Sequence, residues 1–191
     1  MCTPAHGARL FATLVAFRAL SQSRPMSARK PSFAAEAATP EASLVEADLY
    51  QVVGYQLAQA SIVTGRLFAE GVGKSFELRP VEFTVLKLIA DNPDVSARQL
   101  SRALAVTPPN ITMWVDRLVE RGLVTRERSA TDGRAQHLRT TEAGAVLAQA
   151  ACQAVITSER AVLATALSAA EQAMLVELLH KLACCRPSSG A

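Results

Sequence analysis

Four arginines fall within one short segment of the chain, residues 126–141 (RERSATDGRAQHLRTT). The residues on either side of Asp132-Gly133 alternate in polarity, and this dipeptide is favoured in tight turns, so we expect a two-stranded antiparallel hairpin. Arginine is almost never fully buried without a partner, so these side chains are expected to need anions outside the protein. A guanidinium suits phosphate oxygens and the negative potential of a narrow minor groove. The four are Arg126, Arg128, Arg134 and Arg139.

The charge of the chain is unevenly distributed. The 191 residues carry a formal net charge of only +3, which by itself explains little. Residues 96–140, however, contain eight basic and four acidic side chains, whereas residues 44–95 and 141–185 are both net negative. A basic segment between two acidic ones is typical of a localised polyanion-binding surface, although an ordinary solvated face gives the same pattern.

Two short helices joined by a tight turn are predicted just before the hairpin. Ser96 followed by Gln99 is a capping box that begins the first helix. After a four-residue gap, Thr107 suits the N-cap and Pro108 the first position of the second helix, which Gly122 ends. This arrangement is that of a helix-turn-helix, although any two packed helices of an all-α domain would give a similar pattern.

The second of these helices has two different faces. Ile111, Trp114, Val115 and Leu118 form an apolar stripe that is expected to face a core. On the opposite face Asn110 suits adenine, and Thr112 suits a base edge or a thymine methyl group, with a solvated surface position as the alternative. Arg117 suits a phosphate. The opposite face consists of Pro109, Asn110, Thr112, Met113, Asp116 and Arg117.

Long apolar stretches flank this region. Between Leu44 and about Gly71 the apolar residues recur at three- and four-residue intervals, which predicts one long amphipathic helix ended by Gly71 and Gly73. Pro80 begins a further helix. Residues 141–185 are rich in Ala, Leu and Val, and the two stretches together offer more apolar surface than one small domain can hide, which favours an interface.

Several other classes of protein are disfavoured by the sequence. The four cysteines lack the spacing of a disulfide framework or a zinc site, which favours a reducing cytoplasm. His180 and Cys184 are four residues apart but have no second ligand pair, so no metal or cofactor is expected. The three histidines are scattered and no nucleophile elbow is present, so an enzyme is not expected. Arg18 interrupts the N-terminal apolar run too early for a transmembrane helix.

Taken in register, these segments resemble the MarR family of winged helix-turn-helix transcriptional regulators. The resemblance covers about residues 44–185, with departures at Met113 and Thr140. The matching pieces are Leu100 to Pro109, Asp116-Arg117-Leu118, Gly122-Leu123-Val124 with Arg126, Asp132-Gly133-Arg134, and Thr141 to Gly144.

The resemblance implies a mainly α fold with a two-stranded β wing, and a homodimer bound to double-stranded DNA. The helix that begins at Thr107 would enter the major groove, and Arg134, oriented by Asp132, the minor groove. A repressor that responds to an unidentified small-molecule effector is expected. The residues expected at the DNA are Thr107, Pro109, Asn110, Thr112, Met113, Arg117, Arg128, Asp132 and Arg134.

The expected organisation is one domain between two tails. Residues 1–42, in which Met26 is a possible start, and residues 186–191 are expected to be disordered. Cys184 and Cys185 close the last helix, and an intersubunit disulfide there is a hypothesis. The domain, residues 43–185, would have a DNA-binding lobe at 79–140 and dimerisation helices at 43–72 and 141–185.

A winged-helix module that binds only other proteins is the alternative function. In that case the arginines would merely solvate an exposed ribbon. The polar, lightly charged outer face of the helix from Thr107 favours DNA, because a protein-binding helix would more often present aromatic residues or leucines.

Overall fold

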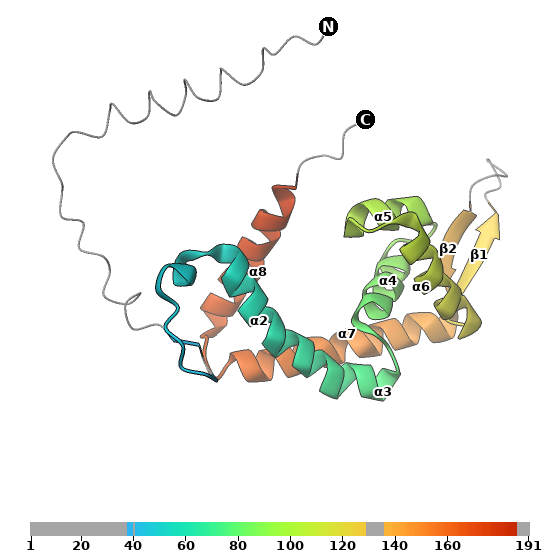
Figure 1. Ribbon diagram of the computed structural model, residues 1–191. Helices are drawn as coiled ribbons and strands as arrows, with labels where there is room; N and C mark the ends of the chain where they lie inside the picture. The colour runs from blue at the N-terminus through green and yellow to red at the C-terminus, as the bar shows by residue number, and fades with distance from the viewer. Residues whose placement is uncertain (1–37, 40, 129–135, 187–191) are drawn as a thin grey trace, which may run out of the picture. The chain divides into compact units, whose positions relative to one another are not determined.

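The computed structural model describes residues 38, 39, 41–128 and 136–186 (Figure 1). The chain divides after residue 56 into two units, and the described residues of each unit are treated by themselves. The expected tails therefore lie almost entirely outside the described residues, as does the predicted Asp132-Gly133 turn.

The long N-terminal helix begins later than the sequence predicted. A 3-10 helix, Ala47–Gln51, comes first, and Val52 then takes an extended conformation (φ −85°, ψ 105°) that separates it from α2, Val53–Phe68. The prediction of one continuous helix from Leu44 is wrong. The β-branched side chains of Val52 and Val53 favour such a break, because they lose rotamer freedom inside a helix.

This helix also continues past the two glycines that were expected to end it. A π-helical turn, Ala69–Gly73, follows α2, and the short helix α3, Lys74–Phe76, follows the turn. A Cβ on Gly73 would lie 3.3 Å from the carbonyl oxygen of Phe68, so glycine accommodates the wider winding. The helix ends instead at Glu77, whose φ of 53° is left-handed.

Three helices follow near the predicted positions: α4, Pro80–Asp91, α5, Ala97–Leu104, and α6, Pro108–Glu120. The Ser96 capping box is confirmed, since Ser96 Oγ accepts from the Gln99 amide at 3.3 Å and Gln99 Oε1 accepts from the Ser96 amide at 2.9 Å. The expected gap of four residues is three, residues 105–107, because Pro108 already belongs to α6.

The ends of α6 match the prediction in position but not in every bond. Thr107 occupies the N-cap with extended backbone, yet its side chain makes no capping hydrogen bond. Pro108 at the first position lacks an amide hydrogen, so one fewer donor needs a partner there. Gly122, with φ at 67°, follows the helix as the predicted glycine terminator.

The predicted hairpin is present as two antiparallel strands, β1, Val124–Arg128, and β2, Gln136–Thr140. The register runs from Val124 opposite Thr140 to Arg128 opposite Gln136. A single residue from the segment before α5 extends the ribbon, because the Leu138 amide donates to the Val95 carbonyl at 2.9 Å. The ribbon lies beside α6 in Figure 1.

One apolar core holds these elements against α7, Glu142–Leu163. The predicted stripe of α6 is confirmed: Ile111, Val115 and Leu118 are buried, and Trp114 packs against the same cluster. Helix α8, Ala169–Cys184, follows and contributes no buried residue within the described part of the chain. The remaining buried apolar residues are Val72, Leu78, Val85, Leu86, Ile89, Leu100, Leu123, Val124, Leu138, Ala148 and Ala151.

The first turn of α7 packs directly on the turn between α6 and β1. Thr141 Oγ1 donates to the Gly122 carbonyl at 2.8 Å and accepts from the Gly144 amide at 3.0 Å. The Thr141 amide donates to the Leu123 carbonyl at 3.0 Å. A Cβ on Gly144 would lie 1.9 Å from the Leu123 carbonyl oxygen, so only glycine fits this position.

Gly144→Ala is expected to lower the free energy of unfolding by ~1–3 kcal/mol, because the methyl group must push the Leu123 backbone away. Gly65→Ala on α2 is the matched control, since a Cβ there meets no atom within 4 Å. The control should be neutral or stabilising by about 0.5–1 kcal/mol. Chemical denaturation measures both variants, and equal stability of the two would contradict the packing described for Gly144.

Candidate nucleic-acid interface

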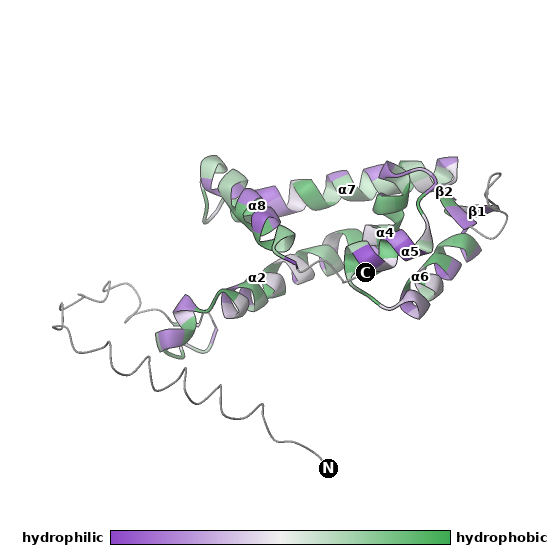
Figure 2. Ribbon diagram, turned by 90° about the horizontal axis from the view of Figure 1, so that it is seen from above, coloured by the Kyte–Doolittle hydropathy of each residue, from purple (hydrophilic) through white to green (hydrophobic). Residues whose placement is uncertain are grey.

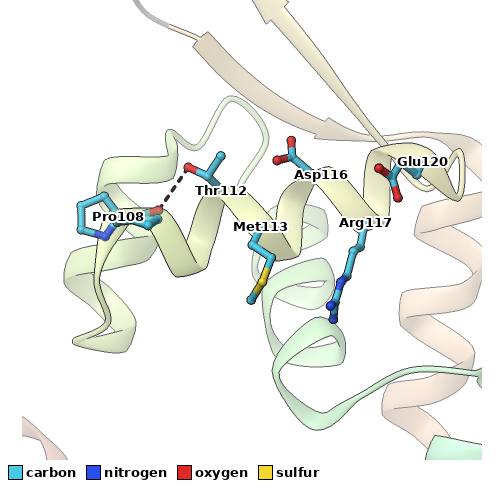
Figure 3. Close-up of a pocket in the computed structure, with 7 residues that line it drawn as sticks. Pro108, Thr112, Met113, Asp116, Arg117 and Glu120 are labelled. Carbon is cyan, nitrogen blue, oxygen red and sulfur yellow. Dashed lines mark hydrogen bonds between the residues drawn. The ribbon is translucent and has the colours of Figure 1, made fainter.

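The outer face of α6 is open, and Figure 3 looks directly onto it. Thr112 and Asp116 lie along one edge of this face, and Met113 and Arg117 along the other. Between them is a shallow hollow of ≈ 610 Å³. Its lining residues are Pro108, Pro109, Thr112, Met113, Asp116, Arg117 and Glu120.

The other predicted α6 residues are also at the surface. Thr107, Pro109 and Asn110 are exposed, and the side-chain amide of Asn110 makes no hydrogen bond to any described residue. Thr112 Oγ1 donates to the Pro108 carbonyl at 3.1 Å, so its hydroxyl hydrogen is used inside the helix. The side-chain amide of Asn110, by contrast, has all its hydrogen-bonding capacity available to an outside partner.

Arg117, a predicted phosphate contact, is turned toward α4. Its Nη1 donates to Glu82 Oε1 at 3.3 Å, and Glu82 is only 6% exposed. The Arg79 amide donates to Glu82 Oε2 at 3.1 Å, so both carboxylate oxygens are satisfied. A buried carboxylate is costly unless it is paired in this way. The pair holds α6 on α4, and contact between Arg117 and phosphate stays a prediction.

Both hairpin arginines whose side chains the structure describes, Arg126 and Arg139, have carboxylate partners within the protein, contrary to the expectation that they need outside anions. Arg126 of β1 forms an ion pair with Asp116 of α6. Arg139 of β2 donates from Nε and Nη2 to the two oxygens of Asp94, at 2.7 and 2.8 Å. Each strand of the ribbon is thus tied to a different part of the lobe, which sets the direction of the ribbon relative to α6.

The ion pair between Asp94 and Arg139 has further contacts around it. His137 Nδ1 lies 2.7 Å from the Asp94 carbonyl oxygen, and the Arg139 guanidinium also lies 3.5 Å from Glu127 Oε2. The hydrogen bond from Arg139 lowers the pKa of Asp94, with desolvation acting in the opposite direction. The same hydrogen bond raises the pKa of Arg139. Asp94 has a left-handed φ of 70°, which places its carboxylate toward β2.

The remaining predicted wing residues fall outside what the structure describes. Asp132 and Arg134 belong to residues 129–135, and for Arg128 only the backbone pairing with Gln136 is described. Their roles at DNA stay predictions.

Sequence reasoning missed three arginines that matter to the interface. Arg121 donates to the carbonyls of Glu77 at 2.7 Å and Phe76 at 3.2 Å, which fastens the end of α6 to the end of α3. Arg98 and Arg102 on α5 are exposed, and neither forms an ion pair with any residue in the described ranges. Their basic character was visible in the sequence, but their freedom from carboxylate partners was not.

Cys184 Sγ lies 3.7 Å from His180 Nε2 at the exposed end of α8, and Cys152 is half-buried on α7. Among the described residues, no three potential metal ligands are grouped together. No helix within the described ranges is long and apolar enough to cross a membrane.

Helices α5 and α6, the tight turn between them and the following two-stranded ribbon define a winged helix-turn-helix protein. Residues 76–135 match the MarR family. Over 141 residues the chain is 31% identical to a proposed transcriptional regulatory protein for the hcr operon of Thauera aromatica, with 74% of this chain and 84% of that protein covered. The chain belongs to the MarR family of transcriptional regulators.

Solved structures of the same fold agree with this assignment. The repressor CouR bound to a 23-mer DNA duplex is similar with a TM-score of 0.67 and 28% identity, covering 73% of this chain and 98% of that one. PcaV of Streptomyces coelicolor, in complex with its natural ligand, has a TM-score of 0.63 and 25% identity, covering 72% and 96%. MarR of E. coli, in its apo form, has a TM-score of 0.59 and 27% identity, covering 68% and 96%.

We expect Asp94→Asn to lower the free energy of unfolding near neutral pH and to make that free energy depend less on pH. Because the folded-state pKa of Asp94 is lowered, its ion pair contributes stability above the unfolded-state pKa of about 3.9, and this contribution is lost as the pH falls through the folded-state value. Asn tolerates the left-handed backbone, so the variant removes the charge and keeps the conformation. Denaturation curves from about pH 7 to about pH 3 should show the two proteins converging at the acid end. If the difference in unfolding free energy between the two proteins were the same at every pH, the stabilising role of the Asp94–Arg139 ion pair would be contradicted.

Proposed function

We propose that this protein is a homodimeric transcriptional repressor that binds double-stranded DNA and releases it in response to a small molecule. The observation that carries the proposal is the open outer face of α6 beside a ribbon that ion pairs hold in a set direction. A helix that projects polar groups next to a fixed β wing suits the adjacent major and minor grooves of one duplex.

The proposed contacts divide into those that read bases and those that hold the backbone. Base reading is assigned to the first two turns of α6, where Pro109, Asn110, Thr112 and Met113 are exposed. Thr107 at the start of α6 suits a phosphate, as helix N-termini do.

The basic residues complete the proposed interface. Arg98 and Arg102 of α5 add positive charge beside α6. In the wing, Arg128 is assigned to the phosphates, and Arg134, oriented by Asp132, to the minor groove. These assignments are supported by CouR, a repressor whose structure contains a DNA duplex.

A homodimer is supported by apolar surface that the chain leaves uncovered. Within the described chain, helix α8 has no buried residue, and its large apolar side chains are exposed to solvent. The hydrophobic residues along α7 and α8 appear in green in Figure 2. Contiguous exposed apolar surface usually marks an interface. The exposed large hydrophobic residues of α8 are Met174, Leu175, Val176, Leu178, Leu179 and Leu182.

In the proposed dimer, residues 43–72 and 141–185 supply the dimerisation helices and residues 79–140 the DNA-binding lobe. A two-fold pair of lobes would read half-sites about 34 Å apart, one turn of the duplex. The structure of PcaV in complex with its natural ligand supports a regulator that responds to a ligand. A repressor acts where the DNA is, so we propose the cytoplasm as its location.

The affinity for DNA should fall steeply with added salt, and Arg134→Ala should flatten that dependence. Each phosphate-type contact contributes about 0.9 to the slope of log K against log salt, so the variant should lose roughly that amount. Arg160→Ala, on α7, is the control and should leave the slope unchanged. Fluorescence anisotropy with a duplex selected from a random-sequence pool measures all three proteins. If the protein binds no duplex from such a pool, the DNA-binding function is wrong and the protein-binding alternative gains support.

Val176→Glu is expected to convert the dimer to a monomer, because Val176 is 69% exposed in the single chain and a buried carboxylate at the interface would be unpaired. Since Val176 is not part of the apolar core, the monomer should keep its helical content. Gln149→Glu, at an exposed polar position of α7, is the matched control. Sedimentation velocity at several protein concentrations gives the oligomeric state. A wild-type chain that sediments as a monomer would contradict the proposed dimer.

A further inference from the structure

The centre of the outer face of α6 is apolar. Pro108, Pro109 and Met113 line the hollow, and Met113 is 42% exposed although it is a large hydrophobic residue. Thr112 contributes a methyl group beside them. A surface that faced only water or phosphates would gain nothing from this concentration of carbon atoms.

Arg117 and Asp116 on the same face already have charged partners within the protein. Arg117 is the one basic residue between Pro108 and Glu120, and it is bonded to the buried Glu82 of α4. Asp116 is paired with Arg126 of the wing. The commonest specific contact to guanine is a bidentate arginine or lysine, so this helix lacks a free group for it.

Thr112 is exposed, and its hydroxyl hydrogen is already used within α6. Its hydroxyl donates to the Pro108 carbonyl at 3.1 Å, a bond drawn in Figure 3. The hydroxyl can then only accept a hydrogen bond from a partner, and the Cγ2 methyl offers an apolar contact. Glu120 also lines the hollow, but it lies on the last turn, whereas a recognition helix reads bases from its N-terminal residues.

We infer that α6 recognises thymine 5-methyl groups in the major groove, through the methyl of Thr112 and the side chains of Pro109 and Met113. This inference rests on the proposed function and specifies its ligand: half-sites whose central pairs are A·T, with thymine methyl groups facing the hollow. The free amide of Asn110 fits the same pairs, because asparagine binds adenine N6 and N7. Apolar contact with the thymine methyl is an established mode of direct readout.

Uracil in place of thymine tests the inference, because it removes only the 5-methyl group and keeps every hydrogen-bonding atom. The purified full-length protein first selects a duplex from a random-sequence pool, and footprinting marks the protected positions. Three forms of that duplex are then compared: unmodified, with deoxyuridine at protected thymines, and with deoxyuridine only outside the footprint. Burial of one methyl group corresponds to about a fourfold change in affinity, so each contacted thymine should contribute roughly that factor. Deoxyuridine outside the footprint should have no effect.

A matched pair of variants separates the methyl of Thr112 from its hydroxyl. Thr112→Ser keeps the hydroxyl that bonds to Pro108 and removes the methyl, so its preference for thymine over uracil should shrink by about fourfold at one position of each half-site. Thr112→Val keeps the methyl and removes the hydroxyl, so it should retain the wild-type preference. The salt dependence of binding should be the same for the two variants, and this equality would show that the lobe and the wing remain in place.

Three results would overturn the inference. Equal affinity of the wild-type protein for thymine and uracil duplexes would exclude methyl recognition while leaving DNA binding intact. A preference kept by Thr112→Ser and lost by Thr112→Val would assign the reading to the hydroxyl. Failure of the protein to select any duplex would remove the proposed function itself, and this inference with it.

Discussion

The close approach of α7 to the Leu123 carbonyl is the constraint on which the lobe depends. Thr141 joins the two through its hydroxyl and its amide, and Gly144 leaves room for the contact because it has no side chain. The end of α6, the start of β1 and the start of α7 meet at this point. A shift of α7 would therefore move α6 and the wing together, and in the proposed function this would couple the geometry of the dimer to DNA binding.

Carboxylates then set the directions of the elements that reach outward. Asp116 and Asp94 each hold one strand of the wing, and Glu82 holds α6 through Arg117. Exposed ion pairs contribute little to stability, so those of the wing act mainly on orientation. The hairpin is rich in arginine for two reasons: some guanidiniums fasten the ribbon to the lobe, and the others remain for the DNA in the proposed function.

Much of the candidate site could be predicted from the sequence because its signals are local. The periodicity of Ile111, Val115 and Leu118 indicated which side of α6 is buried, and that assignment left Asn110, Thr112 and Met113 on the open side. The partners of Arg117 and Arg139 could not be predicted. They lie 35 and 45 residues away in the chain, and no spacing rule links residues so far apart.

The sequence by itself determined the helices of the lobe, the Ser96 capping box, the two strands and the family, because helix periodicity, capping boxes and turn residues depend on neighbours a few positions away. Tertiary structure alone decided which arginines are tied down, why position 144 must be glycine, and that the first helix widens at Gly71 and Gly73 and does not stop there. These features depend on packing against distant segments. The free energy of such contacts arises only when the folded chain brings those segments together.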